Sequence, residues 1–142
     1  MSVRAVAIRL KIPDNEAYTA LTALRRLTVD IGRLERADIW LLNDDAAKDD
    51  FVERVERNEM LFNPNKHELE MLSADRPRSG EVWIAEIDAA DEPLRIEGVA
   101  WGRRYTGWRL FSHGHEPASE SIVREAAEKL LCNPAIEKAI YS

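Results

Sequence analysis

The chain has 142 residues, of which 45% are hydrophobic and 32% charged, a balance that suits a water-soluble domain with its own core. Its net charge of −6 argues against nucleic acid or an anionic membrane as a partner held by general electrostatic attraction, and its single cysteine, Cys132, excludes an internal disulfide framework. No apolar run approaches the ~18 residues of a membrane span, and the first residues lack the long apolar region of a signal peptide. We therefore expect a cytoplasmic protein with no membrane association.

The first half of the chain predicts strand, helix, strand, helix and strand, in that order. Residues 3–12 alternate as a half-buried strand does, with these side chains on one face: Val6, Ile8, Leu10 and Ile12. Asp14 or Asn15 can then cap a helix over residues 16–27. An extended segment follows over residues 29–43, around Gly32.

A second amphipathic helix is predicted over residues 46–61, and its apolar face would consist of Phe51, Val52, Val55 and Met60. Asn63 and Pro64 end this helix, because proline disfavours helical backbone at the residue before it. Residues 67–72 can then return as a short strand. The polar stretch 73–80, with one proline and one glycine, is the best internal boundary.

The second half predicts a strand over residues 81–87, a loop over 88–98, a strand over 99–112, a helix over 120–132 and a final strand over 135–141. Segment 88–98 is short and contains Pro93, so it is interpreted as a loop. The predicted helix would be supported by a Glu125–Lys129 pair. Its apolar face would be Ile122, Val123, Ala126 and Leu130.

The two halves repeat each other at a constant offset of 70 residues. Ile31-Gly32-Arg33 matches Trp101-Gly102-Arg103, and the segments 60–64 and 130–134 both end in Leu-x-Asn-Pro. We therefore predict an α+β fold of two ferredoxin-like units, residues 1–72 and 81–142 joined by linker 73–80. The units would form a pseudo-twofold antiparallel sheet covered by helices, and the second unit would lack its first helix.

The stretch Glu-Lys-Leu-Leu-Cys-Asn-Pro-Ala-Ile-Glu (128–137) resembles the end of the PurS family, the small subunit of bacterial and archaeal phosphoribosylformylglycinamidine synthase. Members also carry a Val-x-x-Gly-Lys/Arg motif on the preceding strand. This chain has that motif twice, from Val29 to Arg33 and from Val99 to Arg103. The chain thus looks like a fused tandem of two PurS-like units, although ordinary members are about half its length.

The resemblance implies a non-catalytic bridging subunit of a glutamine-dependent amidotransferase in purine biosynthesis. Its implied partners are the large synthase subunit and the glutaminase subunit, and a homodimer is possible. The chain would carry no catalytic residue, metal or cofactor of its own.

Six residues are predicted to contact a partner: Arg33, Lys66, Trp101, Arg103, Arg104 and Tyr105. Trp101, Arg103 and Tyr105 would share one face of a strand, and Trp, Tyr and Arg are the usual hot-spot types of protein interfaces. The same strand, 99–111, could instead stack single-stranded bases or a nucleotide, or it could simply pack against its neighbours. A small enzyme with a site between the two halves is a further alternative.

Other candidate residues favour structural roles. His113 and His115 could bind a metal, but ligands at a suitable spacing are sparse, so a solvated turn is the better interpretation. Cys132 is expected to pack rather than react, because no base or cationic group stands near it in the sequence. Gly32 and Gly102 belong to no phosphate-binding motif and are typical of a bulge or a close backbone approach within a strand.

Overall fold

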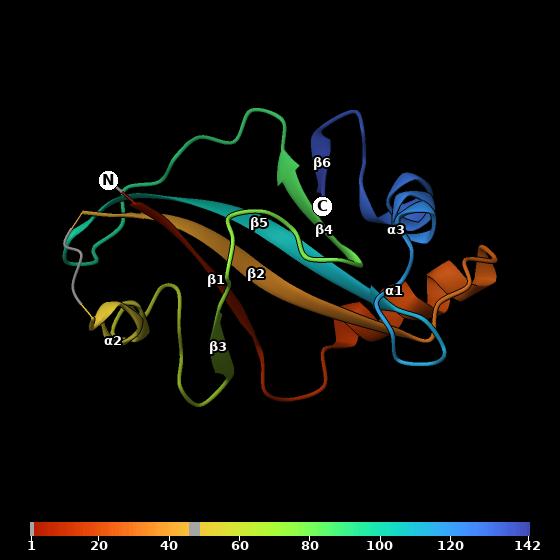
Figure 1. Ribbon diagram of the computed structural model, residues 1–142, viewed down its shortest axis with the longest axis horizontal. Coiled ribbons are helices and arrows are strands. Elements are labelled where there is room, and N and C mark those ends of the chain that lie inside the picture. The colour runs from red at the N-terminus through yellow and green to blue at the C-terminus, as the bar shows by residue number, and fades with distance from the viewer. Residues whose placement is uncertain (1, 46–48) are drawn as a thin grey trace. The chain divides into compact units, whose positions relative to one another are not determined.

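The computed structural model describes residues 2–45 and 49–142. Within these residues the protein is α+β, with an open antiparallel sheet of six strands, three α-helices and one π-helical turn (Figure 1). Their order confirms the predicted sequence of strands and helices in both halves. The elements are β1 (Ser2–Leu10), α1 (Asn15–Arg26), β2 (Arg33–Asp44), α2 (Phe51–Glu56), β3 (His67–Met71), β4 (Glu81–Glu86), β5 (Val99–Phe111), α3 (Glu120–Ala126), the π-turn η1 (Ala127–Leu131) and β6 (Glu137–Tyr141).

The order of strands in the sheet is β3-β1-β2-β5-β4-β6. In the repeat, β1 corresponds to β4, β2 to β5 and β3 to β6. Counted inward from either edge, the sheet therefore has the same order: the third strand of a copy, then its first, then its second. The edge strands β3 (His67–Met71) and β6 (Glu137–Tyr141) keep the offset of 70 residues at both ends. The repeat in the sequence therefore corresponds to a repeat in topology.

Contacts between Cα atoms divide the chain into two compact units. Unit 1 comprises residues 1–13, 37–75 and 90–105, and unit 2 comprises residues 14–36, 76–89 and 106–142. Each unit thus takes segments from both halves of the sequence, and β2 and β5 each contribute residues to both. The predicted boundaries at 72 and 81 describe the sequence repeat and stay a prediction.

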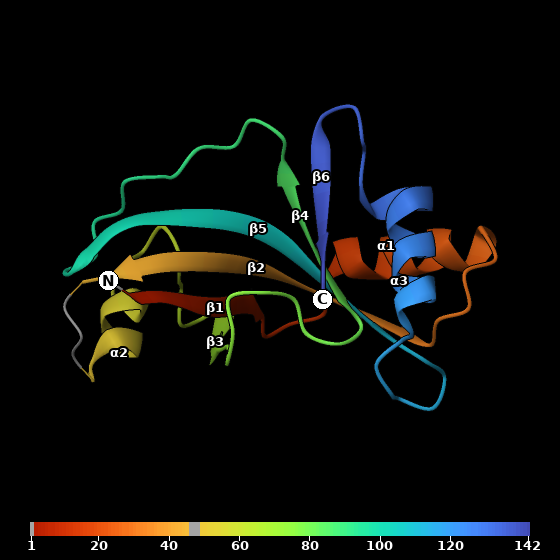
Figure 2. The same ribbon diagram turned by 45° about the horizontal axis from the view of Figure 1, so that its top comes forward.

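Unit 2 has its core between α1, α3 and one face of its strands. Asp14 caps α1, because its Oδ1 accepts hydrogen bonds from the backbone N–H groups of Glu16 and Ala17 at 3.0 and 3.2 Å. In both views α1 and α3 lie side by side (Figures 1 and 2). The buried apolar residues of this core include Ala17, Leu24, Leu34, Val82, Ile84, Trp108, Leu110, Val123 and Leu131.

Unit 1 has a second core, in which Phe51 and Val55 of α2 pack with residues of β1 and β2. Residues 90–98 contain no helix, as predicted, and they contribute the buried Ile96 and the partly buried Leu94 to this core. The buried apolar set is Val6, Ile8, Trp40, Leu42, Phe51, Val55, Leu61, Phe62, Ile96 and Val99.

The same asparagine turn precedes both edge strands. The Asn63 carbonyl accepts hydrogen bonds from the backbone N–H groups of Lys66 and His67, and the Asn133 carbonyl accepts them from Ile136 and Glu137. Each asparagine side chain accepts from the N–H two residues later, at 2.9 Å in the first copy and 3.2 Å in the second. The recurrence of Asn-Pro therefore has a structural cause.

Met60 and Ile12 are predicted on an inward face, but both lie outside the core. Helix α2 ends at Glu56 rather than at residue 61, and Met60 is 91% exposed in the turn that follows it. Asn58 forms that turn, because its Oδ1 accepts from the N–H groups of Met60 and Leu61. Ile12 is 62% exposed because β1 ends at Leu10. The predicted start of the second helix, residues 46–48, lies outside the described residues.

Leu130 was also predicted to be inward and is exposed, whereas Leu131 is buried. The cause is the change to π-helical pairing in η1, where the Cys132 N–H donates to the Ala127 carbonyl five residues earlier, at 3.0 Å. The extra residue within this hydrogen-bonded loop rotates the following side chains away from the face that an α-helix would give them. The predicted Glu125–Lys129 pair is present at 2.6 Å.

Candidate protein-interaction site

Trp101, Arg103 and Tyr105 occupy alternate positions of β5 and therefore lie on one face of this strand. The Arg103 guanidinium lies 5.8 Å from the centre of the Trp101 ring, and its Nε donates to Asp91 Oδ1 at 2.8 Å. A hydrogen bond with Tyr105, and then one with Asp91, raises the pKa of Arg103 above its ordinary value. These four residues form a connected cluster in unit 1, the β5 cluster.

The residues of the β5 cluster differ in how far a partner could reach them. Tyr105 is 5% exposed, so it forms a hydrogen bond with Arg103 but offers a partner little surface of its own. The side chain of Arg103 is 42% exposed, and Trp101 is partly exposed. Arg104 is also exposed, but it points to the opposite side of the strand because neighbouring residues alternate. The structure therefore joins three of the six predicted residues and separates Arg104 from them.

Arg33 belongs to unit 2, where it has a different environment. Its guanidinium lies 4.1 Å from the centre of the Phe111 ring, and its Nη2 is 3.7 Å from Glu35 Oε2. Arg33 and Arg103 are equivalent in the repeat, yet one stacks on an aromatic ring of another strand and the other is held by a carboxylate. The difference follows from the sequence, since Leu41 stands 70 residues before Phe111 and provides no ring.

Lys66 is exposed in the asparagine turn before β3. Its backbone carbonyl accepts a hydrogen bond from the Lys11 N–H at 2.8 Å, which ties the turn to the end of β1. Within residues 2–45 and 49–142 the side chain of Lys66 forms no hydrogen bond or ion pair, so none joins it to the β5 cluster. Lys66 therefore remains a separate predicted contact residue.

Gly32 and Gly102 both mark close approaches, as predicted, but only Gly102 lies within a strand, because β2 begins at Arg33, one residue after Gly32. A Cβ atom on Gly32 would lie 2.7 Å from the backbone Cα of His113, and one on Gly102 would lie 2.5 Å from Cδ1 of Leu94. A side chain at either position would displace its neighbours. In unit 1 this close approach brings Leu94 against the face of β5 opposite to Trp101 and Arg103.

The remaining candidates have simple surroundings. His113 and His115 are exposed, and His113 Nε2 lies 2.9 Å from Asp30 Oδ1. Burial raises the pKa of the Cys132 thiol, and Glu137 adds to the effect, so Cys132 is a poor nucleophile. Among residues 2–45 and 49–142 no group of three or more His, Cys, Asp and Glu side chains could hold a metal ion. No helix in the same residues is long and apolar enough to cross a membrane.

Sequence reasoning missed a buried ion pair in unit 1. Arg54 and Asp44 are 3% and 1% exposed, and two nitrogens of the guanidinium lie 3.2 and 3.3 Å from the two oxygens of the carboxylate. Arg54 also donates to Asp50 and to the Glu97 carbonyl. The only sign of this pair in the sequence is that Arg54 recurs 70 residues later as Arg124. The repeat does not indicate which of the two arginines is buried.

No protein-family model and no curated protein matches the chain.

Proposed function

We propose that this protein is a non-catalytic bridging subunit of a glutamine-dependent amidotransferase of the phosphoribosylformylglycinamidine synthase type. It would act in the cytoplasm, in purine biosynthesis, as a fused tandem of two ferredoxin-like, PurS-like units. Its partners would be the large synthase subunit and the glutaminase subunit. The surface used would include the β5 cluster, with Arg33, Lys66 and Arg104 as further contacts.

The observation that carries this proposal is the repeated unit itself. In each half a strand pair is followed by a helix, an asparagine turn and an edge strand, and the second copy contains the PurS-like segment 128–137. Two equivalent outer edges suit a protein that holds two partners at once. Exposed arginine beside tryptophan adds side chains of the type that dominate protein interfaces.

The test is reconstitution with the purified large subunit and glutaminase from the same organism, with assembly measured by sedimentation velocity. We expect a ternary complex, and glutamine-dependent amide transfer that requires this protein. Arg103→Glu should weaken assembly by roughly tenfold or more, because it replaces a partly exposed hot-spot cation by an anion beside Asp91.

Arg95→Glu is the matched control, since Arg95 is exposed in the same unit and its change alters the net charge equally. Arg103→Gln removes the positive charge without adding a negative one. Comparing it with Arg103→Glu therefore separates loss of the arginine contact from repulsion between the new glutamate and Asp91. Absence of any complex with the natural protein would refute the proposed function. If Arg103→Glu and Arg95→Glu weakened assembly equally, the β5 cluster would not be part of the interface.

A further inference from the structure

Two arginines in unit 2 lie against one buried aromatic ring. The guanidinium carbons of Arg33, on β2, and Arg109, on β5, are 4.1 and 5.1 Å from the centre of the Phe111 ring. Phe111 is 6% exposed, whereas 47% of the Arg33 side chain is exposed. We call these three residues the Arg33–Arg109 cluster.

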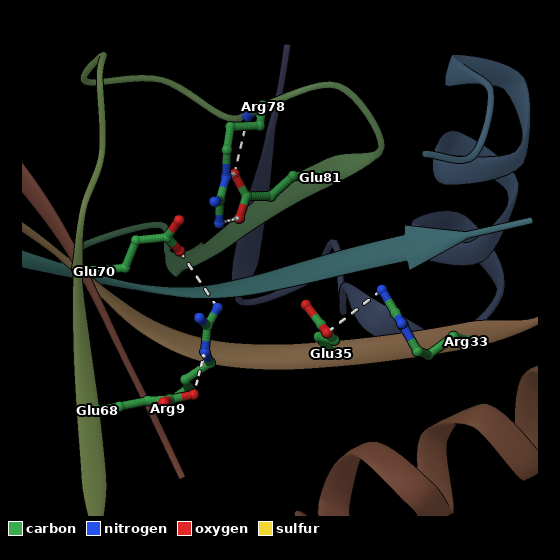
Figure 3. A network of polar contacts seen from close by, with 7 residues as sticks. All are labelled: Arg9, Arg33, Glu35, Glu68, Glu70, Arg78 and Glu81. Atoms are coloured by element: carbon green, nitrogen blue, oxygen red, sulfur yellow. Dashed lines mark hydrogen bonds and ion pairs between the residues drawn. The ribbon is translucent and has the colours of Figure 1, made fainter. Parts of the chain in front are cut away.

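Arg109 has no carboxylate partner among the described residues, although one stands opposite to it. Glu81 is its cross-strand neighbour on β4. The Glu81 carboxylate instead accepts three hydrogen bonds from Arg78, from the backbone N–H at 2.9 Å, from Nε at 3.3 Å and from Nη2 at 3.1 Å. Figure 3 shows Arg78 folded against Glu81 in this way.

The hydrogen-bonding capacity of the cluster is therefore incompletely used. The Nε of Arg109 is buried without a hydrogen-bond partner, which costs free energy in the isolated protein. Arg33 has Glu35 at 3.7 Å, longer than the roughly 2.7–2.9 Å of a strong charge-assisted hydrogen bond (Figure 3). Among the described residues, Arg109 therefore has no carboxylate partner and Arg33 has only the longer contact with Glu35.

We propose that the Arg33–Arg109 cluster is a docking site for an acidic segment of a protein partner. The partner's carboxylates would accept hydrogen bonds from the two guanidinium groups, whose planes are oriented by stacking on Phe111. The argument is charge complementarity, and it does not depend on the amidotransferase role or on the identity of the partner. Glu35, whose side chain is 37% exposed beside Arg33, disfavours a continuous run of phosphates along the cluster.

The probe is a fluorescein-labelled oligoglutamate peptide, titrated with the whole protein at low ionic strength and followed by fluorescence anisotropy. Because the protein carries a net charge of −6, general electrostatics repels this peptide, and binding would report a local site. We expect saturable binding that weakens with salt. Arg109→Gln and Arg33→Gln should each weaken it by about tenfold.

Arg76→Gln is the matched control, because Arg76 is exposed in unit 2 and the change removes the same charge. It should leave binding unchanged. Arg109→Gln should also leave the urea midpoint unchanged or higher, since it removes a buried unpaired donor, whereas a merely structural arginine would lower that midpoint. The double variant Arg33→Gln, Arg109→Gln should abolish binding.

Three results would overturn the proposal. They are no binding to the natural protein, equal weakening by Arg76→Gln, and tighter binding of a single-stranded RNA oligomer that depends on Arg109. The last result would assign the cluster to nucleic acid. None of these outcomes bears on assembly with the synthase subunits, because the titration contains this protein alone.

Discussion

Arg54 and Arg124 occupy the same position of the repeat, but their surroundings differ. Arg54 is buried and bidentate to Asp44, and this hydrogen bond is the main cause that raises the pKa of Arg54 above its ordinary value. Arg124 is exposed, pairs with Glu120 at 2.9 Å and lies 4.1 Å from the centre of the Tyr141 ring. One repeat position has thus become part of a core in unit 1 and of a surface in unit 2.

We predict that Arg54→Ala lowers the free energy of unfolding by about 3–5 kcal/mol, because it leaves the Asp44 carboxylate buried with reduced compensation. Arg124→Ala should cost no more than about 1 kcal/mol, as exposed ion pairs do. Urea denaturation of both variants, followed by circular dichroism, measures the difference. The Nε of Arg4 also lies 3.3 Å from Asp44 Oδ2, on the same carboxylate. If Arg54→Ala cost as little as Arg124→Ala, the buried Arg54–Asp44 pair would not stabilise the fold as predicted.

For the candidate site, the sequence predicted which residues of β5 share a face, because alternation along a strand needs only the strand's extent. It did not predict that Tyr105 is buried or that Asp91 holds Arg103, since Asp91 lies in a loop whose path depends on tertiary contacts. Arg109 was not singled out either. Arg109 lacks a carboxylate partner among the described residues because Arg78 forms hydrogen bonds with Glu81, and no pattern in the sequence predicts that pairing.

Among the elements, periodicity predicted the order of strands and helices but not where two helices end. The second helix stops at Glu56 because the Asn58 side chain competes for backbone N–H groups, and the third continues as a π-turn. Both outcomes depend on one or two hydrogen bonds rather than on the apolar pattern. The ends of the helices were therefore less predictable than their existence.

The asparagine turns allow a prediction about an element boundary. The N–H of Asn133 donates to Glu137 Oε1 at 2.9 Å, and the N–H of Asn63 donates to His67 Nδ1 at 3.0 Å. Glutamate in one copy and histidine in the other thus supply a hydrogen-bond acceptor at the same position of the repeat. We predict that Glu137→Ala costs about 1 kcal/mol of stability, whereas Glu137→Gln, which keeps an oxygen at this place, is nearly neutral.

The comparison of these two variants is made by urea denaturation at constant pH. Glu137→Gln serves as the control, because it removes the charge and keeps the shape of the side chain. Equal losses for Ala and Gln would mean that the charge of Glu137 matters, rather than its hydrogen bond to Asn133.

For the whole molecule, the repeat and the compact units give different divisions of one chain. Residues 1–75 lack the segment 90–105, which contributes Ile96 and Val99 to the core of unit 1. Residues 76–142 lack 14–36, and with it helix α1 and the Leu24 and Leu34 side chains of the core of unit 2. Each half of the sequence is therefore expected to lose an essential part of a core when it stands alone.

We predict that fragments 1–75 and 76–142 are each unfolded in isolation and regain native structure when mixed. The cut lies between Asp75 and Arg76, both exposed, so the break itself should disturb little. Far-ultraviolet circular dichroism and tryptophan fluorescence would follow the separate and the mixed fragments, since Trp40 lies in the first and Trp83, Trp101 and Trp108 in the second. Because both cores need segments from both fragments, recovery should saturate at a one-to-one ratio. A fragment that folds alone as a monomer would instead show that the sequence repeats 1–72 and 81–142 are autonomous domains, and that the exchange of segments between the halves is dispensable for folding.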